Sequence, residues 1–312
     1  MTPAAAILCK LLSVTLLVGM MSLIKASSAE VPTGQIVFFR SFFALPVIIV
    51  WLIARKELST GLKTVDPWGH LWRGLVGSTA MALNFLALGL LPLPEVTAIS
   101  YATPIVVVVF AAMFLGETVR LFRLSAVAIG LVGVLVVLSP RLSSLSADGL
   151  QAGGLGASET LGAVIALGAA VAAALAQVFI RKLTRTERTA SIVFWFSVTA
   201  TVLSLTTLPF GWVIPSPGTT AMLIGAGVFG GIGQILLTTA YRHADASVIA
   251  PFDYASMLLA VALGYVVFNE VPTVQTLIGA GIVICAGALI IGREHRLGLE
   301  REKQRKAMSP SG

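Results

Sequence analysis

Ten long apolar segments dominate this chain, and their lengths restrict what it can fold into. The segments cover residues 5–26, 33–54, 70–91, 94–115, 120–139, 160–181, 190–210, 219–241, 246–268 and 272–292. Each is close to the ~20 residues that an α-helix needs to cross ~30 Å of hydrocarbon at ~1.5 Å per residue. The sequence therefore predicts an all-α membrane protein with ten transmembrane helices.

Positive charge is distributed unevenly among the connections between these segments. With a cytoplasmic N-terminus, 17 of the 21 lysine and arginine residues fall in cytoplasmic segments, and the outside loops carry only Arg141. The opposite orientation would reverse this excess, against the positive-inside rule. We therefore expect a multi-pass protein of the bacterial inner membrane with both termini in the cytoplasm.

The composition excludes an ordinary soluble domain. Hydrophobic residues make up 57% of the chain and charged residues 11%, whereas charged residues make up about 25% of soluble globular domains. The net charge of +7 would suit nucleic acid, but the positive residues line one membrane face and form no groove. We therefore expect the lipid bilayer, and no nucleic acid, as the partner of these charges.

The two halves of the chain repeat one another. Tyr254 follows Tyr101 by 153 residues, and Glu270 follows Glu117 by the same interval. Each half holds five predicted helices, and because five is odd the second half enters the membrane from the opposite side. Inverted repeats of this kind are typical of secondary transporters. The expected order is a first repeat, a periplasmic linker, a second repeat and a basic cytoplasmic tail, at residues 5–139, 140–159, 160–292 and 293–312.

Motifs in the first half resemble the EamA type of the drug/metabolite transporter superfamily. They are an arginine flanked by aromatic residues in segment 37–43 and a Pro-x9-Phe-x-Gly-Glu pattern made by Pro104, Phe114, Gly116 and Glu117. The second half departs from the pattern, with Met257 in place of the proline and Asn269 in place of the glycine. The resemblance covers residues 5–292 and implies a transporter whose fifth and tenth helices are peripheral. Within the superfamily the chain most resembles the bacterial riboflavin-transporter group.

Two charged residues within predicted spans are candidate substrate contacts. Arg40 lies about seven residues into its span, where a cation can pair with a substrate carboxylate, phosphate or polar ring edge; snorkelling to the headgroups is the alternative. Asp253 follows Pro251, which lacks an N–H and disturbs the local helix. Its carboxylate can accept a substrate hydrogen bond or a coupling proton, or can serve the N-terminus of a helix.

Neutral polar residues complete the predicted substrate site. The amides of Asn84, Gln177 and Gln234 can bind a polar metabolite through paired donors and acceptors, or can join helix to helix. Tyr101 and Tyr254 occupy equivalent positions in the two halves, and their rings suit a planar substrate.

Signatures of enzymes, cofactors and metals are missing from the sequence. No segment matches the nucleotide-binding pattern GxxxxGK[ST], the GxSxG elbow or the HExxH zinc motif. Cys9 and Cys285 stand alone within predicted spans, without metal-ligand or redox spacing. We therefore expect no cofactor, no metal and no catalytic site.

These features together favour a secondary transporter that moves a small organic metabolite by alternating access. Riboflavin uptake is the favoured activity, and an exporter of amino acids or other amphiphilic metabolites is the alternative. A membrane-embedded enzyme and a structural subunit are rivals of other classes. Gly227 and Gly231 have GxxxG spacing, which we expect to pack helices within a monomer, although a weak homodimer uses the same motif.

Overall fold

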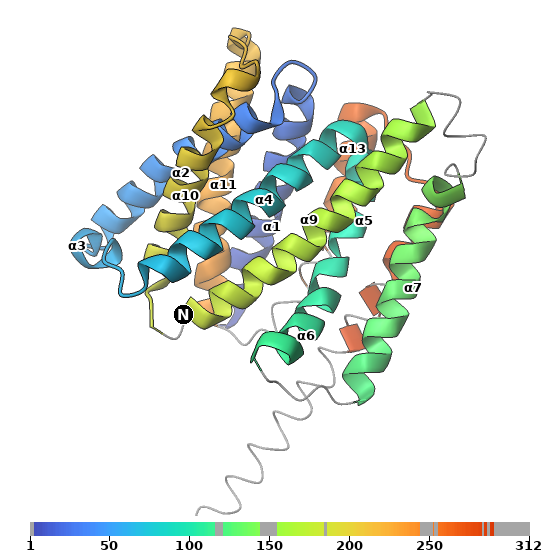
Figure 1. Cartoon of the computed structure of the whole chain (residues 1–312), viewed down its shortest axis with the longest axis horizontal. Helices are drawn as coiled ribbons and strands as arrows, with labels where there is room; N and C mark the ends of the chain where they lie inside the picture. Colours follow the sequence, from blue (N-terminus) through green and yellow to red (C-terminus); the bar gives the residue numbers. More distant parts are fainter. Residues whose placement is uncertain are drawn as a thin grey trace, which may run out of the picture.

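The computed structural model consists of long helices packed side by side (Figure 1). It describes residues 3–115, 121–143, 155–183, 186–243, 252, 255–282, 284, 285, 288 and 289. No β-strand occurs within these ranges. The predicted all-α class is therefore confirmed.

The helices of the first half are α1 Pro3–Ser27, α2 Thr33–Ala54, α3 Leu58–Gly61, α4 Pro67–Leu90, α5 Leu93–Ser100, α6 Ala102–Leu115 and α7 Leu121–Ser143. Those of the second half are α9 Leu155–Leu183, α10 Thr189–Leu205, the short 3-10 helix η1 Leu208–Phe210, α11 Pro217–His243 and α13 Ala255–Phe268. Residues 274–282 are also helical. The extent of α2 coincides with the predicted span 33–54.

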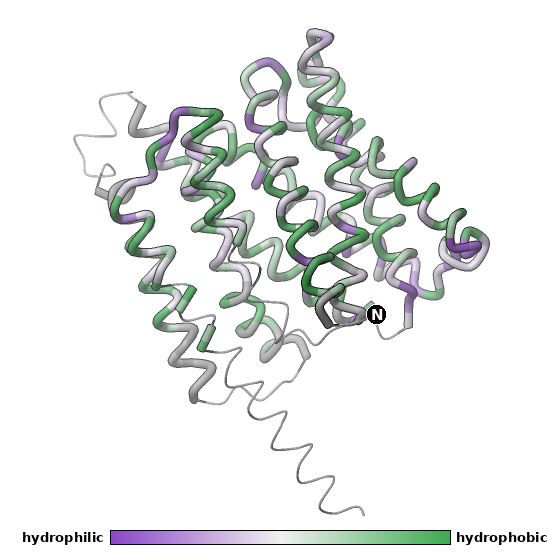
Figure 2. The backbone as a smooth tube through the Cα atoms, turned by 180° about the vertical axis from the view of Figure 1, so that it is seen from behind, coloured by the Kyte–Doolittle hydropathy of each residue, from purple (hydrophilic) through white to green (hydrophobic). Residues whose placement is uncertain are grey.

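Several of the helices are long and apolar enough to cross a membrane. Five meet that criterion by length and composition among the described residues: α1, α2, α4, α9 and α11. Shorter apolar helices occupy four more of the predicted spans. Figure 2 shows hydrophobic residues along most of the helices, with hydrophilic residues gathered at connections such as the one between α2 and α4. The count of ten spans stays a prediction.

The fourth predicted span, 94–115, is wrong as a single helix. A turn at Tyr101 divides it into α5 and α6. The proline at position 104, three residues after this turn, explains the break, because proline has no N–H to donate to the carbonyl oxygen of Ser100. Two short helices therefore replace one long helix at this place in the first half.

The seventh predicted span, 190–210, extends too far. Helix α10 ends at Leu205, and the hydroxyl groups of Thr206 and Thr207 bond back to carbonyl oxygens of the last turn, each at 2.6 Å. Pro209 then prevents the helix from continuing, since its ring conflicts with the preceding turn. Gly211 follows with φ = 90°, a left-handed conformation that suits glycine.

Helices of the two halves pack in reciprocal pairs. The first long helix of one half packs along the third of the other, as α1 with α11 and α4 with α9. The second helices, α2 and α10, pack against each other, and so do α5 and α13. An approximate two-fold axis between the halves predicts this pairing, because it exchanges each helix of one half with the equivalent helix of the other. The packing therefore supports two inverted repeats, and the repeat limits stay a prediction.

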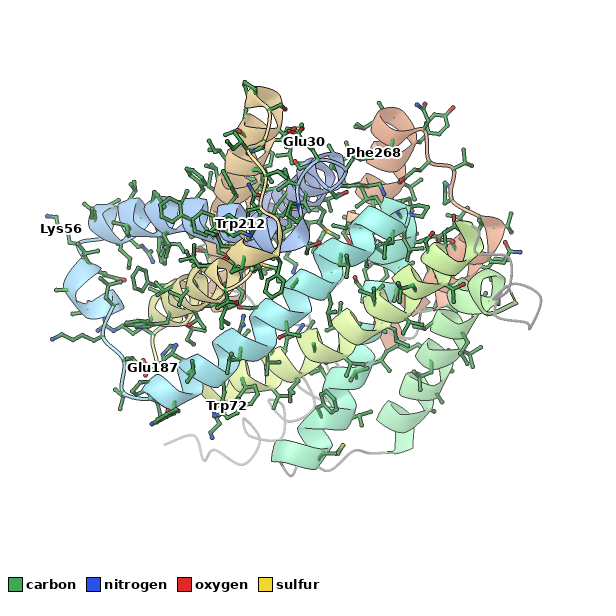
Figure 3. All side chains as sticks on the ribbon, turned by 45° about the horizontal axis from the view of Figure 1, so that its top comes forward. Glu30, Lys56, Trp72, Glu187, Trp212 and Phe268 are labelled. Atoms are coloured by element: carbon green, nitrogen blue, oxygen red, sulfur yellow. The ribbon has the colours of Figure 1, made fainter. Side chains whose placement is uncertain are left out.

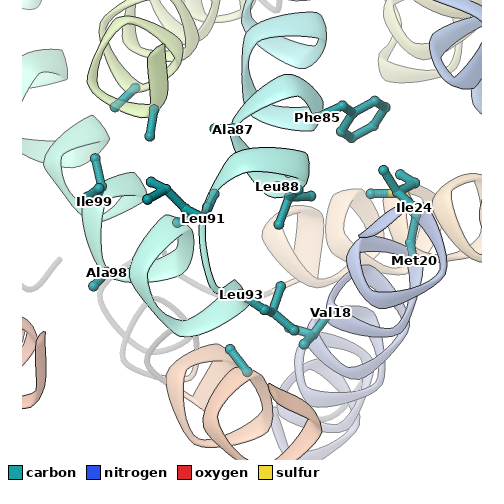
Figure 4. Close-up of a cluster of buried hydrophobic side chains, with 14 of the residues drawn as sticks. Val18, Met20, Ile24, Phe85, Ala87, Leu88, Leu91, Leu93, Ala98 and Ile99 are labelled. Atoms are coloured by element: carbon teal, nitrogen blue, oxygen red, sulfur yellow. The ribbon is translucent and has the colours of Figure 1, made fainter. Parts of the chain in front are cut away.

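Apolar side chains fill the junction between the halves (Figure 4). Val18 and Ile24 of α1, Phe85 and Leu88 of α4, and Leu93 of α5 belong to one buried cluster. The cluster continues into the second half through α9, α11 and α13. Lipid chains are as apolar as these residues, so close packing, more than the hydrophobic effect, holds helices together in a membrane.

Gly227 gives α11 its close approach to α2. A Cβ added at Gly227 would lie 2.5 Å from Phe43 Cβ and 3.0 Å from the carbonyl oxygen of Phe39. One turn later, a Cβ at Gly231 would lie 3.0 Å from Val47 Cβ. The GxxxG spacing therefore packs two helices of the same chain, as predicted.

Gly227→Ala is expected to lower the melting temperature of the purified protein. The new methyl group meets the α2 backbone, which cannot move alone, and overpacking of this kind costs ~1–3 kcal/mol. Thermal unfolding in detergent, followed by tryptophan fluorescence, measures the effect. Gly218→Ala is the matched control, because a Cβ there meets nothing within 4 Å and alanine favours the helix. Equal melting temperatures for Gly227→Ala and the wild type would contradict this packing.

Candidate functional site

Two buried arginines lie against one aromatic ring between the halves. The guanidinium carbons of Arg40 on α2 and Arg73 on α4 lie 5.9 and 4.3 Å from the centroid of the Phe196 ring on α10. The two residues are 7% and 8% exposed. A cation within ~6 Å of a ring centroid is attracted to the ring face. Phe196 therefore stabilises two like charges, which we call the arginine pair.

The arginine pair has donors without acceptors. Arg40 Nε, Arg73 Nε and Arg73 Nη1 are buried and have no hydrogen-bond partner in the part of the chain that the structure describes. Neither side chain forms an ion pair with a carboxylate of the described residues. Buried charges in proteins are normally paired or hydrogen-bonded, because desolvation is costly. The arginine pair therefore holds three buried N–H donors that have no acceptor among the described residues.

Two glycines make room for these side chains. Gly77 lies one turn after Arg73 on α4, and a Cβ there would overlap Arg73 Nη1. A Cβ at Gly230 on α11 would lie 3.1 Å from Arg40 Nε. Any larger residue at either position would displace a guanidinium, so both halves shape the surroundings of the arginine pair.

A second polar group lies at the break between α5 and α6. Tyr101, a predicted binding residue, shares a hydrogen bond of 2.7 Å with Ser256 Oγ near the start of α13. Asn84, also predicted, donates a long hydrogen bond of 3.4 Å to Ser100 Oγ. These contacts join α4, α5 and α13 and thus both halves. Interrupted helices near mid-membrane are typical of transporter binding sites.

One face of α4 connects the two polar groups. Asn84 follows Arg73 by 11 residues, which is about three turns at ~3.6 residues per turn, so the two side chains share a face ~17 Å apart. The arginine pair and the polar group around Tyr101 therefore lie along the same face of α4.

The other predicted binding residues have different positions. Gln234 is half-buried on α11, one turn beyond Gly230, on the helix face that approaches Arg40. Gln177 on α9 is exposed, and the structure brings it to neither polar group. Asp253 and Tyr254 lie outside the described residues.

At one end of the bundle, an ion pair joins the halves. Lys25 Nζ at the end of α1 lies 2.9 Å from Glu270 Oε1 just beyond α13. The same ammonium donates to the carbonyl oxygens of Leu88 at 3.0 Å and Leu91 at 2.6 Å, and Glu270 Oε2 accepts from Leu93 N at 2.8 Å. We call this set the Lys25–Glu270 contact. It ties α1 and the end of α4 to the second half.

Glu30 adds a second link at this end of the bundle. Its carboxylate accepts hydrogen bonds from Ser216 N and Thr219 Oγ1 at the start of α11. The bond from Thr219 and then the bond from Ser216 lower the pKa of Glu30, because both favour the ionised form. Figure 3 shows Glu30 and Phe268 at this end and Glu187 at the other.

At the opposite end, Glu187 joins the halves. This residue lies between α9 and α10, and its Oε1 accepts hydrogen bonds from Thr64 Oγ1 at 2.7 Å, Val65 N at 2.6 Å and Asp66 N at 2.9 Å. His70 Nε2 lies 3.6 Å from the same oxygen. We call this set the Glu187 contact. It fixes the connection that precedes α4, whose N-terminus Asp66 caps by accepting from Gly69 N at 2.8 Å.

The environment of Glu187 lowers its pKa. Burial by itself would raise the pKa, but the hydrogen bonds from Asp66 N, Thr64 and Val65 N outweigh burial and hold the pKa below its ordinary value of 4.5. Glu187 is therefore ionised at neutral pH, which strengthens each of these bonds.

The sequence did not reveal three residues that make the polar contacts described above, namely Arg73, Lys25 and Glu187. Arg73 counted as a cytoplasmic positive charge, whereas the structure buries it beside Phe196. Lys25 was not linked to Glu270, and Glu187 was not singled out. The one local signal was that Arg73, Gly77 and Asn84 share a helix face; the other partners are far apart in sequence.

Named relatives of this chain are transporters. The pseudopaline exporter of Pseudomonas aeruginosa is 29% identical over 88% of this chain and 91% of its own. The S-adenosylmethionine uptake transporter of Rickettsia bellii is 28% identical over 84% of each chain. The riboflavin transporter of Rhizobium johnstonii is 27% identical over 85% of this chain and 83% of its own.

The chain also resembles a solved structure in its fold and a protein family in its sequence. A solved crystal structure superposes with a TM-score of 0.64 at 22% identity, over 92% of this chain and 97% of that one, which shows a shared fold. Residues 4–139 and residues 160–292 each match the EamA-like transporter family. The two matches together take in most of the sequence, and the chain belongs to this family of membrane transporters.

Proposed function

We propose that this protein is a secondary transporter that moves a small organic metabolite by alternating access. The observation that carries the proposal is that the halves are tied at both ends of α4. The Glu187 contact lies where α4 begins, and the Lys25–Glu270 contact lies where it ends. Helix α4 has 24 residues, so the two contacts are ~36 Å apart at ~1.5 Å per residue. That distance exceeds the ~30 Å of hydrocarbon.

Polar contacts at opposite ends suit a protein that opens at one end at a time. Breaking the Lys25–Glu270 contact frees α1 and α4 from α13 while the Glu187 contact holds. Breaking the Glu187 contact while the Lys25–Glu270 contact holds opens the end at which α4 begins. We propose that the Glu187 end faces the cytoplasm, because the distribution of positive charge favours that orientation. Between the ends, the contacts of the apolar cluster are non-directional, so rocking of the halves breaks no directional bond within the cluster, and the Tyr101–Ser256 bond is a polar contact that the motion would have to rearrange.

The cargo is proposed from the chemistry of the site and from the relatives. We propose Arg40, Asn84, Tyr101 and Gln234 as substrate contacts, and riboflavin taken inward as the first cargo to test, because the motifs resemble the riboflavin-transporter group. The exporter relative favours a second candidate, the export of amino acids or other amphiphilic metabolites. The intrachain packing of Gly227 supports a monomer as the functional unit.

Uptake by reconstituted vesicles tests the function. Vesicles that contain the protein are expected to accumulate labelled riboflavin faster than protein-free vesicles. Tyr101→Phe removes the hydroxyl that bonds Ser256 and is expected to slow accumulation, whereas Tyr265→Phe, whose side chain is exposed on α13, is the matched control and retains the rate. Riboflavin flux equal to that of protein-free vesicles would contradict the cargo. If S-adenosylmethionine and amino acids also failed to move in either direction, the transport proposal would fall.

A further inference from the structure

We propose that the arginine pair binds a carboxylate or phosphate group of the transported metabolite. The proposal rests on the transport function above but not on riboflavin as its cargo, and it narrows the substrate class to anions and zwitterions. Arg40 and Arg73 are the residues that recognise the anionic group, and Phe196 holds the two guanidiniums in place.

The positive charge of the arginine pair is not balanced by any carboxylate among the described residues. Two guanidiniums lie against one ring, within electrostatic range of each other, and no carboxylate among the described residues pairs with them. Like charges at low dielectric repel more strongly than they do in water. An anion between them would convert this repulsion into two attractive contacts.

The N–H donors of the arginine pair match an anionic group in type and number. Arg40 Nε, Arg73 Nε and Arg73 Nη1 have no acceptor in the described part of the chain. Guanidinium groups match the planar oxygens of carboxylates and the oxygens of phosphates through paired N–H bonds. A neutral sugar or amide would satisfy donors but would leave both charges uncompensated. Riboflavin carries no such anionic group, so this site ranks riboflavin 5′-phosphate and other acidic metabolites above riboflavin.

The arginine pair lies where the two halves of the chain meet. The arginines come from α2 and α4, while Phe196 and Gly230, which lie against them, come from α10 and α11 of the other half. An anion bound here would lie at the junction of the two halves of the transporter. Because the arginines are 7% and 8% exposed, a ligand reaches them only when the helices separate, as alternating access requires.

Thermal unfolding of the full-length protein in detergent tests the assignment. Sodium phosphate or sodium succinate, compared with sodium chloride at equal ionic strength, is expected to raise the melting temperature of the wild type, since a ligand bound only by the folded state stabilises it. The stabilisation is expected to be lost in Arg40→Met and Arg73→Met. In Arg73→Lys the affinity for the anion is expected to weaken roughly tenfold, because a point charge replaces the planar fork.

The Met variants also distinguish a binding role from a structural one. Without added anion, Arg40→Met and Arg73→Met are expected to melt above the wild type, because each removes an unpaired buried cation. A structural arginine would give the opposite change. Arg55→Met is the matched control, since Arg55 is exposed over Trp51 at 5.3 Å, and it is expected to keep the anion-dependent shift. The proposal would be overturned if the Met variants melted below the wild type or failed to fold. It would also be overturned if the anion did not raise the melting temperature of the wild type, or raised that of the Met variants equally.

Varying the lipid distinguishes a soluble anion from a lipid headgroup as the ligand of the arginine pair. The same measurement in nanodiscs of phosphatidylcholine should keep the shift caused by soluble phosphate or succinate. Stabilisation by phosphatidylglycerol alone would assign the arginines to a lipid headgroup and overturn the substrate assignment. Transport of a neutral solute by vesicles that contain the wild-type protein would also refute the anion-binding proposal, but it would still support the transport function. Anion binding in a protein that moves no solute would instead contradict the proposed function.

Discussion

Glu187→Ala is expected to destabilise the protein by on the order of 3 kcal/mol and to open the end of the bundle at which α4 begins. One carboxylate oxygen accepts bonds from Thr64, Val65 and Asp66, and hydrogen bonds to a charged group contribute ~1.5–3 kcal/mol each, with less where water can replace the acceptor. The connection before α4 then loses these bonds and is held to the second half by the bonds that Ser191 and Trp195 of α10 donate to its carbonyl oxygens. Thermal unfolding measures the loss of stability. Glu57→Ala is the matched control, because the Glu57 carboxylate makes no hydrogen bond to the described residues.

The stabilisation by Glu187 has a defined pH dependence. Its pKa is lowered in the folded state from the ordinary value of 4.5, so its contribution is complete above that value and is lost as pH falls through the folded pKa. The melting-temperature difference between the wild type and Glu187→Ala should therefore be constant from about pH 6 to pH 8 and should shrink at acid pH. A difference that shrank between pH 8 and pH 6 would show that another group titrates at this contact.

Lys25→Met is expected to open the other end of the bundle. The substitution leaves Glu270 without its cation and leaves the carbonyl oxygens of Leu88 and Leu91 without their shared donor. Breaking a buried pair costs ~3–5 kcal/mol, and partial exposure of both side chains, 13% and 17%, reduces this cost. A loss of even ~1.4 kcal/mol shifts a two-state equilibrium tenfold toward the open form.

Cysteine labelling measures this opening. In a variant with Cys9 and Cys285 replaced by alanine, a cysteine at Ser256 is expected to react roughly tenfold faster with a membrane-impermeant thiol reagent when Lys25 is methionine. Lys63→Met is the matched control, since the Lys63 side chain is exposed. Unchanged labelling in Lys25→Met would show that this ion pair does not hold the end closed.

The extents of most helices were predictable because they depend on local composition. Helix α2 begins and ends where its apolar run does, and α1, α4 and α11 differ from the predicted spans by a few residues at each end. The predictions were wrong where a proline interrupts an apolar run: Pro104 divides the fourth span, and Pro209 shortens the seventh. Proline acts through one missing donor and one clash, which average hydrophobicity does not register.

The candidate site was predictable only in part. Arg40 stood out because a charge deep in an apolar span is unusual, and Tyr101 because it has a counterpart in the second half. The burial of Arg73 depends on Phe196, which is 123 residues away and on another helix. Gln177 met the same sequence criteria as Asn84, yet its side chain is exposed, because nothing local tells which face of an apolar helix meets a neighbour.

The sequence by itself determined the membrane class, the family and the lengths of the principal helices, since hydrophobic length is a property of each segment alone. The tertiary structure decided which charges are paired. Lys25 reaches Glu270 and Glu187 reaches Val65 only through the packing of one half against the other, and the same packing leaves Arg40 and Arg73 beside Phe196 without an acceptor among the described residues. The partner of a polar group depends on the relative placement of whole helices, and local composition does not encode that placement.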